Sequence, residues 1–236
     1  MLQTLRNAWR IEEIRRKILF TLLIILLYRL GNAIPVPYVN VAALQSYFAM
    51  LQNTVLGLLD VMSGGAFSQA TIFALSIQPY INASIIIQLL CIAIPALERM
   101  SKEEGEEGRK KIAAITRYVT VAIGLLQGFG FYMLIKNNGI LTPEAQSSVW
   151  AAIVIILTFT SGSALIMWLG EQITEFGIGN GISMILFANI IARIPGGIIL
   201  PIWNNLLWSK WYWALALVIG MLAIIVFVIY VSQAER

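Results

Sequence analysis

The stretch ALSIQPYINASIIIQLL, residues 74–90, decides the fold, because it is apolar enough for a membrane yet contains a proline, an asparagine and two glutamines. The whole chain has a similar character: 59% of its 236 residues are hydrophobic, 12% are charged, and the mean hydropathy is +0.81. Soluble domains are about half apolar and about a quarter charged, so this chain has too few polar side chains to cover a soluble surface. The composition predicts an all-α membrane protein with several spans.

Six apolar runs have the length that a helix needs to cross a bilayer. They cover residues 18–36, 70–97, 113–135, 148–170, 182–202 and 211–231. The first run follows basic residues, as a signal peptide does, but it continues into AIPVPYVN (33–40) without a small-residue cleavage site. We therefore expect it to be retained as a span.

A shorter apolar segment, residues 54–70, lies between the first two runs. Four apolar residues recur in it at helical spacing: Val55, Leu58, Leu59 and Met62. The pair Gly64-Gly65 predicts the end of this helix. The segment is too short to cross a bilayer, which leaves two interpretations open: a re-entrant or interfacial helix, or a surface helix in a long loop.

Basic residues predict the orientation in the membrane. Two groups lie on one side: Arg6, Arg10, Arg15, Arg16 and Lys17 before the first span, and Arg99, Lys102, Arg109, Lys110 and Lys111 after the second. The other side has Lys136, Arg193 and Lys210. Both termini are therefore expected to be cytoplasmic, although the loop at 171–181 contributes Glu171 and Glu175 but no base. The charged stretch 98–111 is either a solvated turn or a docking surface for a cytoplasmic partner.

The sequence contains few of the residues and motifs that catalytic sites use. There is no histidine, the single cysteine (Cys91) cannot form an intrachain disulfide, and Asp60 is the only acid within residues 14–97. No paired carboxylates, hydrolase motif or phosphate-binding loop occurs. Arg29 and Arg193 lie near span ends, where snorkelling can bring their charges to the interface. The sequence predicts no enzyme, no metal and no cofactor.

The polar groups of residues 74–90 share one side of the expected helix. At 100° per residue, one arc holds Ser84, Ile77, Gln88, Ile81, Ile85, Gln78 and Asn82. Amides facing lipid are costly, so we expect this arc to face protein or water, with Pro79 interrupting the helix. Ordinary hydrogen bonding between helices also explains such an arc.

A glycine-rich turn precedes the fifth span, where Gly177, Gly179 and Gly181 alternate. Ile182 and Leu186 follow four residues apart on the new helix. The glycines allow a sharp turn and a close approach of the helix start to its neighbours. They are no nucleotide-binding fingerprint, because the turn joins two spans.

Four motifs together resemble the SecY family, the channel-forming subunits of bacterial protein translocons. They are RLGNAIPVP (29–37), MSGGAFSQATIFALSIQPYINASIIIQLL (62–90), GRKKIAAITRY (108–118) and MWLGEQITEFGIGNGIS (167–183). The resemblance covers the whole chain in order. It implies an hourglass pore that is sealed by an aliphatic ring and a short plug helix and that opens sideways toward lipid through a lateral gate.

The resemblance assigns residues to each of these parts. It implies a pore ring of Ile77, Ile81, Ile182 and Leu186, where leucine at 186 replaces a frequent isoleucine. It implies a plug at about residues 54–67, which includes the apolar residues above and both glycines. Asn82, Ile85 and Gln127 fall at the lateral gate. Arg109, Lys110 and Lys111 are a weaker expectation for contact with a cytoplasmic partner.

The resemblance also implies a division of the chain and a set of partners. Residues 1–17 are expected to be a cytoplasmic segment, 18–202 the first five-helix inverted repeat, and 203–236 a sixth span with the start of a cytoplasmic loop. The implied partners are SecE and SecG, the SecA motor ATPase or a ribosome with its RNA, signal sequences, nascent chains and lipid.

A complete relative has ten spans, so the chain is expected to be a truncated form, an incomplete gene product or one part of a channel completed by another chain. Two alternatives stay open at this point. One is a small-solute transporter with broken helices, and the other is a non-conducting assembly fragment.

Overall fold

The structure is a computed structural model that describes residues 11–102, 105–194 and 211–234. Every regular element in these ranges is a helix, apart from two isolated β-bridges, so the all-α expectation is confirmed. The contacts divide the chain into two compact units, residues 1–190 and 191–236, which are described separately.

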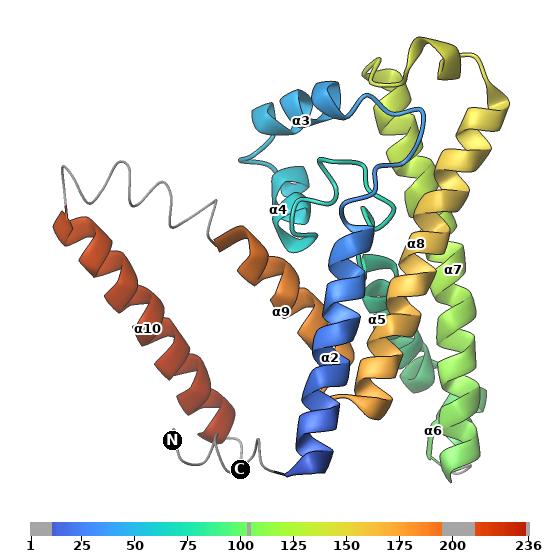
Figure 1. The fold of residues 1–236 in the computed structure, drawn as a ribbon. Helices are drawn as coiled ribbons and strands as arrows, with labels where there is room; N and C mark the ends of the chain where they lie inside the picture. Colours follow the sequence, from blue (N-terminus) through green and yellow to red (C-terminus); the bar gives the residue numbers. More distant parts are fainter. Residues whose placement is uncertain (1–10, 103–104, 195–210, 235–236) are drawn as a thin grey trace. The chain divides into compact units, whose positions relative to one another are not determined.

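Helices run along the whole described chain (Figure 1). They are α2 (Glu12–Gly31), α3 (Val41–Met50), α4 (Val55–Met62), α5 (Gln78–Ala93), α6 (Pro95–Lys102), α7 (Gly105–Asn137), the 3-10 helix η1 (Pro143–Ala145), α8 (Val149–Phe176), α9 (Gly181–Ile194) and α10 (Trp211–Ala234). Within the described residues, α7 and α8 are long and apolar enough to cross a membrane. The other predicted spans fall on α2, which has charged first turns, and on α5, α9 and α10, whose described apolar parts are shorter.

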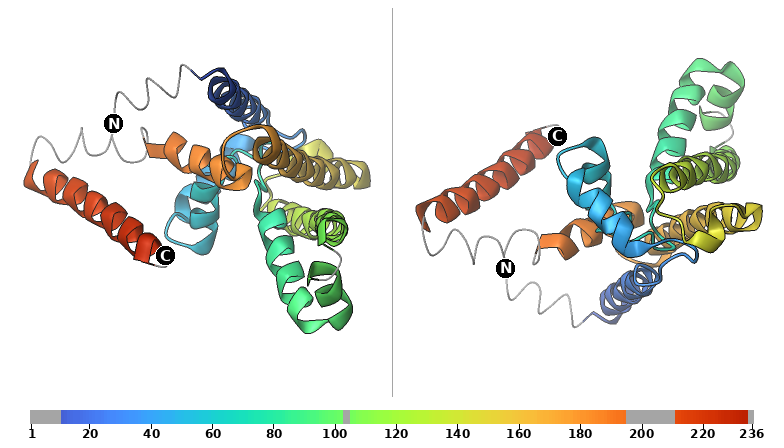
Figure 2. Two further views of the ribbon diagram at one scale, coloured as in Figure 1. Left: turned by 90° about the horizontal axis from the view of Figure 1, so that it is seen from below. Right: turned by 90° about the horizontal axis from the view of Figure 1, so that it is seen from above.

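Helices α7 and α8 pack side by side, as the views along the helices show (Figure 2), and small residues lie at their contact. A Cβ atom on Gly124 would lie 3.0 Å from the Ser163 Oγ atom, and one on Gly128 would lie 3.3 Å from the Ile156 carbonyl oxygen. Small residues allow this close approach, which membrane helices use in place of a hydrophobic driving force. Helix α5 packs on α7, and α2 packs on α8.

The expected second span, 70–97, is helical only from Gln78 onward, so its predicted start is wrong. Residues 70–77 form buried turns, in which Ala70 and Ser76 have φ +44 and +51. Pro79 does not interrupt a helix: it lies in the first turn of α5, where its missing N–H costs no hydrogen bond. The helical projection is therefore invalid before Ile77, and Leu75 belongs to the turns.

The buried turns are held against α8 and against the chain that follows α2. A Cβ atom on Gly162 would lie 2.0 Å from the Ile72 carbonyl oxygen, so only glycine permits this contact. The Val36 N–H donates to the Ala70 carbonyl at 2.8 Å, and the Ile72 N–H donates to the Ile34 carbonyl at 3.0 Å. Non-helical backbone at membrane depth is stable only where protein satisfies it, and this segment meets that condition.

Two further helices differ from the sequence-based expectation. Helix α3 was not predicted, and it begins where the Asn40 side chain accepts a hydrogen bond from the Ala43 N–H at 3.1 Å. The charged stretch 98–111 is not a simple turn, because α6 covers its start and α7 already begins at Gly105. Hydropathy does not predict α6 and the first turns of α7, because these turns contain many charged residues.

The basic segments share one end of the first unit. The amino ends of α2 and α7 and the carboxyl end of α8 lie together at the bottom of Figure 1. Phe20 of α2 and Phe176 of α8 make an edge-to-face contact there, with ring centroids 6.1 Å apart. The grouping of charges that the sequence predicts is therefore present in space.

Helix α10 belongs to the second unit. Its described side chains are apolar and mostly exposed on every side between Ile219 and Val231. A helix that is apolar all round belongs inside a protein or in a membrane.

Candidate functional site

The four residues expected to form a pore ring lie in one apolar cluster. Ile77, at the entrance of α5, is completely buried, and Ile81, Ile182 and Leu186 pack against the same cluster. A Cβ atom on Gly170 of α8 would lie 3.6 Å from both the Ile77 Cδ1 atom and the Ile182 Cγ1 atom. The start of α5 and the first turns of α9 therefore converge, while the role of these residues as a pore ring stays a prediction.

The glycine-rich turn places the start of α9 directly against α8. A Cβ atom on Gly181 would lie 1.9 Å from the Gly170 carbonyl oxygen, and Gly179 has φ +67. The Asn180 side chain accepts hydrogen bonds from the backbone N–H of Ile182 at 3.0 Å and of Ser183 at 3.3 Å. These contacts cap α9, and the predicted sharp turn and close approach are confirmed.

Helix α2 holds this turn and α9 at two points. The Ile178 N–H donates to Thr21 Oγ1 at 3.1 Å. In the last turn of α2, the Arg29 guanidinium donates to the Ala188 carbonyl of α9. The Arg29 charge is therefore partly buried and engaged with a neighbouring helix.

The segment expected to form the plug consists of α4 and the turns that follow it. The predicted end at Gly64-Gly65 is confirmed: α4 ends at Met62, and the two glycines have φ +71 and +89. Most residues from 63 to 68 are buried against the rest of the described chain.

Polar groups tie these turns to α4. The Asp60 side chain is 6% exposed, and its Oδ1 atom accepts a hydrogen bond from the Ser68 N–H at 2.8 Å. Ser63 Oγ accepts one from the Phe67 N–H at 3.1 Å. Helix and turns therefore form one unit, which we call the plug segment, residues 55–68.

The apolar stripe of α4 faces away from the rest of the described chain. Val55 and Leu58 are 74% and 59% exposed, and the buried residues of the helix are Gly57 and Asp60. An amphipathic helix normally buries its apolar stripe. Here the opposite face is buried because Asp60 binds the turns. Two stripe residues, Leu59 and Met62, are half-buried.

A cavity of about 360 Å³ lies between the plug segment, the start of α5 and α7. Leu59 and Ser63 line it from the plug segment, Asn82 from α5 and Gln127 from α7. The structure therefore brings two of the three expected gate residues to the edge of the plug segment. The third, Ile85, does not line this cavity and is 51% exposed on α5.

The mixed arc of α5 lies partly against protein. Gln78 and Asn82 border the cavity, whereas Gln88 is exposed on the described chain. The buried face of α5 is instead made of Pro79, Ala83 and Ile87. This face fits closely against neighbouring helices because its residues are apolar and two of them are small.

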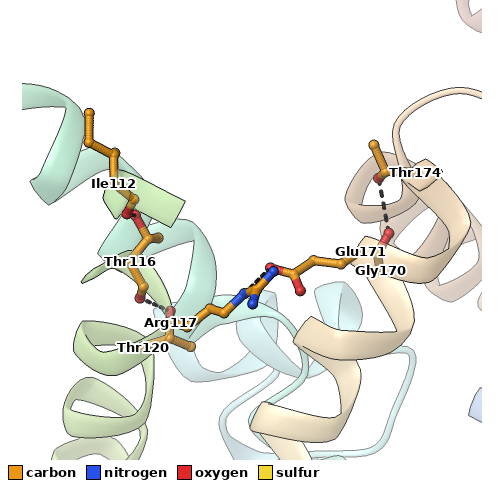
Figure 3. A network of polar contacts seen from close by, with 7 residues as sticks. All are labelled: Ile112, Thr116, Arg117, Thr120, Gly170, Glu171 and Thr174. Atoms are coloured by element: carbon orange, nitrogen blue, oxygen red, sulfur yellow. Dashed lines mark hydrogen bonds and ion pairs between the residues drawn. The ribbon is translucent and has the colours of Figure 1, made fainter. Parts of the chain in front are cut away.

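An ion pair that the sequence analysis missed joins α7 to α8 (Figure 3). Arg117 Nε lies 2.9 Å from Glu171 Oε1. Neighbouring threonines bond to carbonyls of their own helices, as Thr120 does to Thr116 at 2.7 Å and Thr174 does to Gly170 at 3.0 Å. The available signal was that Arg117 is the only charged residue within the run 113–135.

Asn189 of α9 is a second polar residue that the sequence analysis missed. It is completely buried, and its Nδ2 atom donates to Ser76 Oγ at 3.3 Å. Its Oδ1 atom has no hydrogen-bond partner among the described residues. Its spacing from Ile182 and Leu186 puts it on the same face of α9, which was the available signal.

Arg109, Lys110 and Lys111 are exposed on the first turns of α7. This helix has 33 residues and is about 50 Å long, so its charged end extends beyond a hydrocarbon core of about 30 Å. In neighbouring α6, the Glu98 carboxylate accepts a hydrogen bond from Lys102 at 2.7 Å and raises the pKa of that exposed ammonium group. The described residues include no group of three His, Cys, Asp or Glu side chains that could hold a metal ion.

Comparison of structures shows the fold. Two solved structures, one of a protein conducting channel and one of Sec61 in the canine ribosome-channel complex from the endoplasmic reticulum, each give a TM-score of 0.58 at 17% identity. Each match covers 83% of this chain and 42% of the other. The chain is thus an all-helical protein with the fold of these channels.

Comparison of sequences shows the family. The SecY family matches residues 71–236, more than half of the chain. The protein translocase subunits SecY of Bacillus subtilis (strain 168) and Streptomyces scabiei are 45% and 39% identical over 100% of this chain. Since these alignments cover 56% of either relative, the chain spans about half their length. The chain belongs to the SecY family.

Proposed function

We propose that this chain is the N-terminal portion of the central subunit of a protein-conducting channel, which translocates secretory proteins across the cytoplasmic membrane and inserts membrane proteins into it. The observation that carries the proposal is the convergence of Ile77 and Ile182 over Gly170, next to the plug segment. A channel that is closed by an apolar constriction and a plug needs such an arrangement.

The proposed constriction is made of Ile77, Ile81, Ile182 and Leu186. A narrow apolar ring excludes water and ions by dewetting, and it has no fixed charge that would retain a passing polypeptide. Aliphatic side chains with several rotamers also adapt to chains of varied sequence. Membership of the same apolar cluster supports this assignment.

The plug segment is proposed to block this constriction from one side. Its internal hydrogen bonds support movement as a unit, because Asp60 and Ser63 bind their own turns. The exposed stripe of Val55 and Leu58 supports contact with a part of the channel that lies outside this chain.

Asn82, Ile85 and Gln127 are proposed to lie at the lateral gate. The shared cavity supports this role for Asn82 and Gln127, and the exposed position of Ile85 on α5 is compatible with contact to lipid or to a facing helix. Buried amides hold helices together by only about 0.6 kcal/mol per contact, so an entering signal sequence can displace them.

The proposed topology has six spans, α2, α5, α7, α8, α9 and α10, with the plug segment as a re-entrant element. The first five form one inverted repeat, residues 18–202, between the segments 1–17 and 203–236. The clustering of the basic ends of α2 and α7 supports the placement of both termini in the cytoplasm.

The proposed partners are SecE and SecG, with the SecA motor or a ribosome at the cytoplasmic face. The exposed residues Arg109, Lys110 and Lys111 support a contact with an acidic partner or with ribosomal RNA. One structure of similar fold is of Sec61 in a ribosome-channel complex, which favours the ribosome as one such partner.

Reconstitution tests the proposal. The chain is co-expressed with the remaining C-terminal part of the Bacillus subtilis relative and the small subunits, placed in vesicles, and supplied with motor and a secretory protein. We expect protease-protected secretory protein inside the vesicles, and none when either part is omitted. Saturable uptake of a small solute without protein uptake would favour a transporter. Assembly with a small single-span partner but no uptake would favour an assembly fragment.

A further inference from the structure

Asn189 of α9 is buried beside the plug segment with one atom of its side-chain amide unsatisfied among the described residues. Asn189 is completely buried, and Ser76 Oγ, at 3.3 Å, is the partner of its Nδ2 atom. Its Oδ1 atom has no partner among the described residues. A buried polar atom without a partner raises the free energy of the arrangement that buries it. This cost is larger than the free energy gained from one weak hydrogen bond.

The plug segment lies against this unsatisfied side of the amide. A Cβ atom on Gly64 would lie 3.3 Å from Asn189 Oδ1 and 3.2 Å from the Asn189 carbonyl oxygen. The Gly64 N–H already donates to the Val61 carbonyl at 3.0 Å, so the backbone offers no donor to Oδ1. The plug segment therefore keeps water away from Asn189 and gives no hydrogen bond in return.

We propose that Asn189 is a positioning residue that favours displacement of the plug segment. When the plug segment moves away, water reaches the amide and donates a hydrogen bond to Oδ1. The open arrangement therefore has a hydrogen bond that the closed one lacks. This inference rests on the proposed function, in which the plug segment seals the channel. Asn189 lies on the same face of α9 as Ile182 and Leu186, so hydration there lies on the proposed path.

The opposite role, in which Asn189 holds the plug segment closed, makes opposite predictions. Under that role both Asn189→Leu and Asn189→Asp loosen the plug, because either change removes the amide that would hold it. Under the proposed role the sign depends on polarity. Asn189→Leu removes the unsatisfied atom and strengthens closure, whereas Asn189→Asp places a charge that is more costly to bury and weakens closure.

The test measures ion conductance across a planar bilayer that holds the channel assembled with the C-terminal part of the Bacillus subtilis relative, in the absence of secretory protein. We expect the opening frequency of Asn189→Leu to be about tenfold below that of the unsubstituted channel, and that of Asn189→Asp about tenfold above it. Phe187→Leu is the matched control, because Phe187 is 56% exposed on the same helix, and it should leave the frequency unchanged.

A second variant, Ser76→Ala, leaves Asn189 itself unchanged. Its result therefore does not depend on how well a leucine side chain packs at position 189. It leaves both amide atoms of Asn189 without a partner, so it should raise the opening frequency alone and have no effect in the Asn189→Leu background. Higher opening in both the leucine and aspartate variants would overturn the proposal, as would no change in either. A channel that conducts neither ions nor protein in its unsubstituted form refutes the proposed function itself.

Discussion

Ile77 directly precedes α5 and Ile182 lies in the first turn of α9, and both side chains reach 3.6 Å from the position that a Cβ atom on Gly170 would occupy. The relationship depends on two backbone features. Helix α5 begins only after Ile77, and the turn before Ile182 reverses the chain within a few residues. The proposed ring is therefore built at two helix starts, where side chains can project toward a common axis.

Gly170 should tolerate a methyl group but not a larger side chain. Gly170→Ala places its Cβ atom at ordinary van der Waals distance from Ile77 and Ile182. Gly170→Leu overpacks the same space and should lower the free energy of unfolding by about 1–3 kcal/mol. Thermal unfolding in detergent measures both variants. Equal stability of the leucine and alanine variants would show that the two isoleucines do not converge here.

Gly181 should be intolerant even of alanine. The added Cβ atom would lie 1.9 Å from the Gly170 carbonyl oxygen, so α9 would have to shift, at a cost of about 3 kcal/mol. Gly130→Ala is the matched control, because nothing lies within 4 Å of its Cβ position in α7. Removing that helical glycine should stabilise the protein by about 0.5–1 kcal/mol. Similar unfolding temperatures for the two variants would contradict the close approach.

The Arg117–Glu171 ion pair should show coupling between its partners. Arg117 is 54% exposed and Glu171 24%, so the pair should contribute about 0.2–1 kcal/mol. Arg117→Glu places two carboxylates together and should destabilise the protein. The double variant Arg117→Glu with Glu171→Arg should recover most of the loss in a double-mutant cycle. Additive effects of the two single changes would mean that the side chains do not interact.

Asp60 should control the order of the plug segment. Asp60→Ala removes the acceptor of the Ser68 N–H, whereas Asp60→Asn keeps an oxygen at that place. Hydrogen exchange of the Ser68 amide should become about tenfold faster in the alanine variant and change less in the asparagine variant. An unchanged exchange rate of the Ser68 amide in the alanine variant would show that the turns keep their structure without this carboxylate.

Hydropathy located the long helices but not their ends. The predicted run 113–135 corresponds to the longer helix α7, Gly105–Asn137. The run 148–170 corresponds to α8, Val149–Phe176, which ends six residues later. Both helices continue through charged turns that extend past the apolar run. The opposite error occurred at residues 70–77, which are apolar but not helical, because a buried turn and a buried helix have the same composition.

The candidate site could be predicted where a motif fixed its residues. The residues proposed for the ring and the glycines of the turn before α9 were predicted in this way, and the structure brings them together. Arg117, Glu171 and Asn189 were missed, since each makes its contact with a residue that is distant in the sequence. The burial of Asp60 and the exposure of Val55 likewise depend on tertiary contacts that periodicity does not contain.

The path of a secretory polypeptide through the proposed ring is the central claim, and cysteine crosslinking tests it most directly. In a Cys91→Ser background, single cysteines replace Ile77 or Ile182, or the exposed controls Leu89 (61%) and Leu126 (74%). The assembled channel then receives an arrested secretory chain that carries one cysteine. We predict disulfide adducts at positions 77 and 182 and none at 89 and 126. Adducts at the control positions, with none at 77 and 182, would contradict the claim.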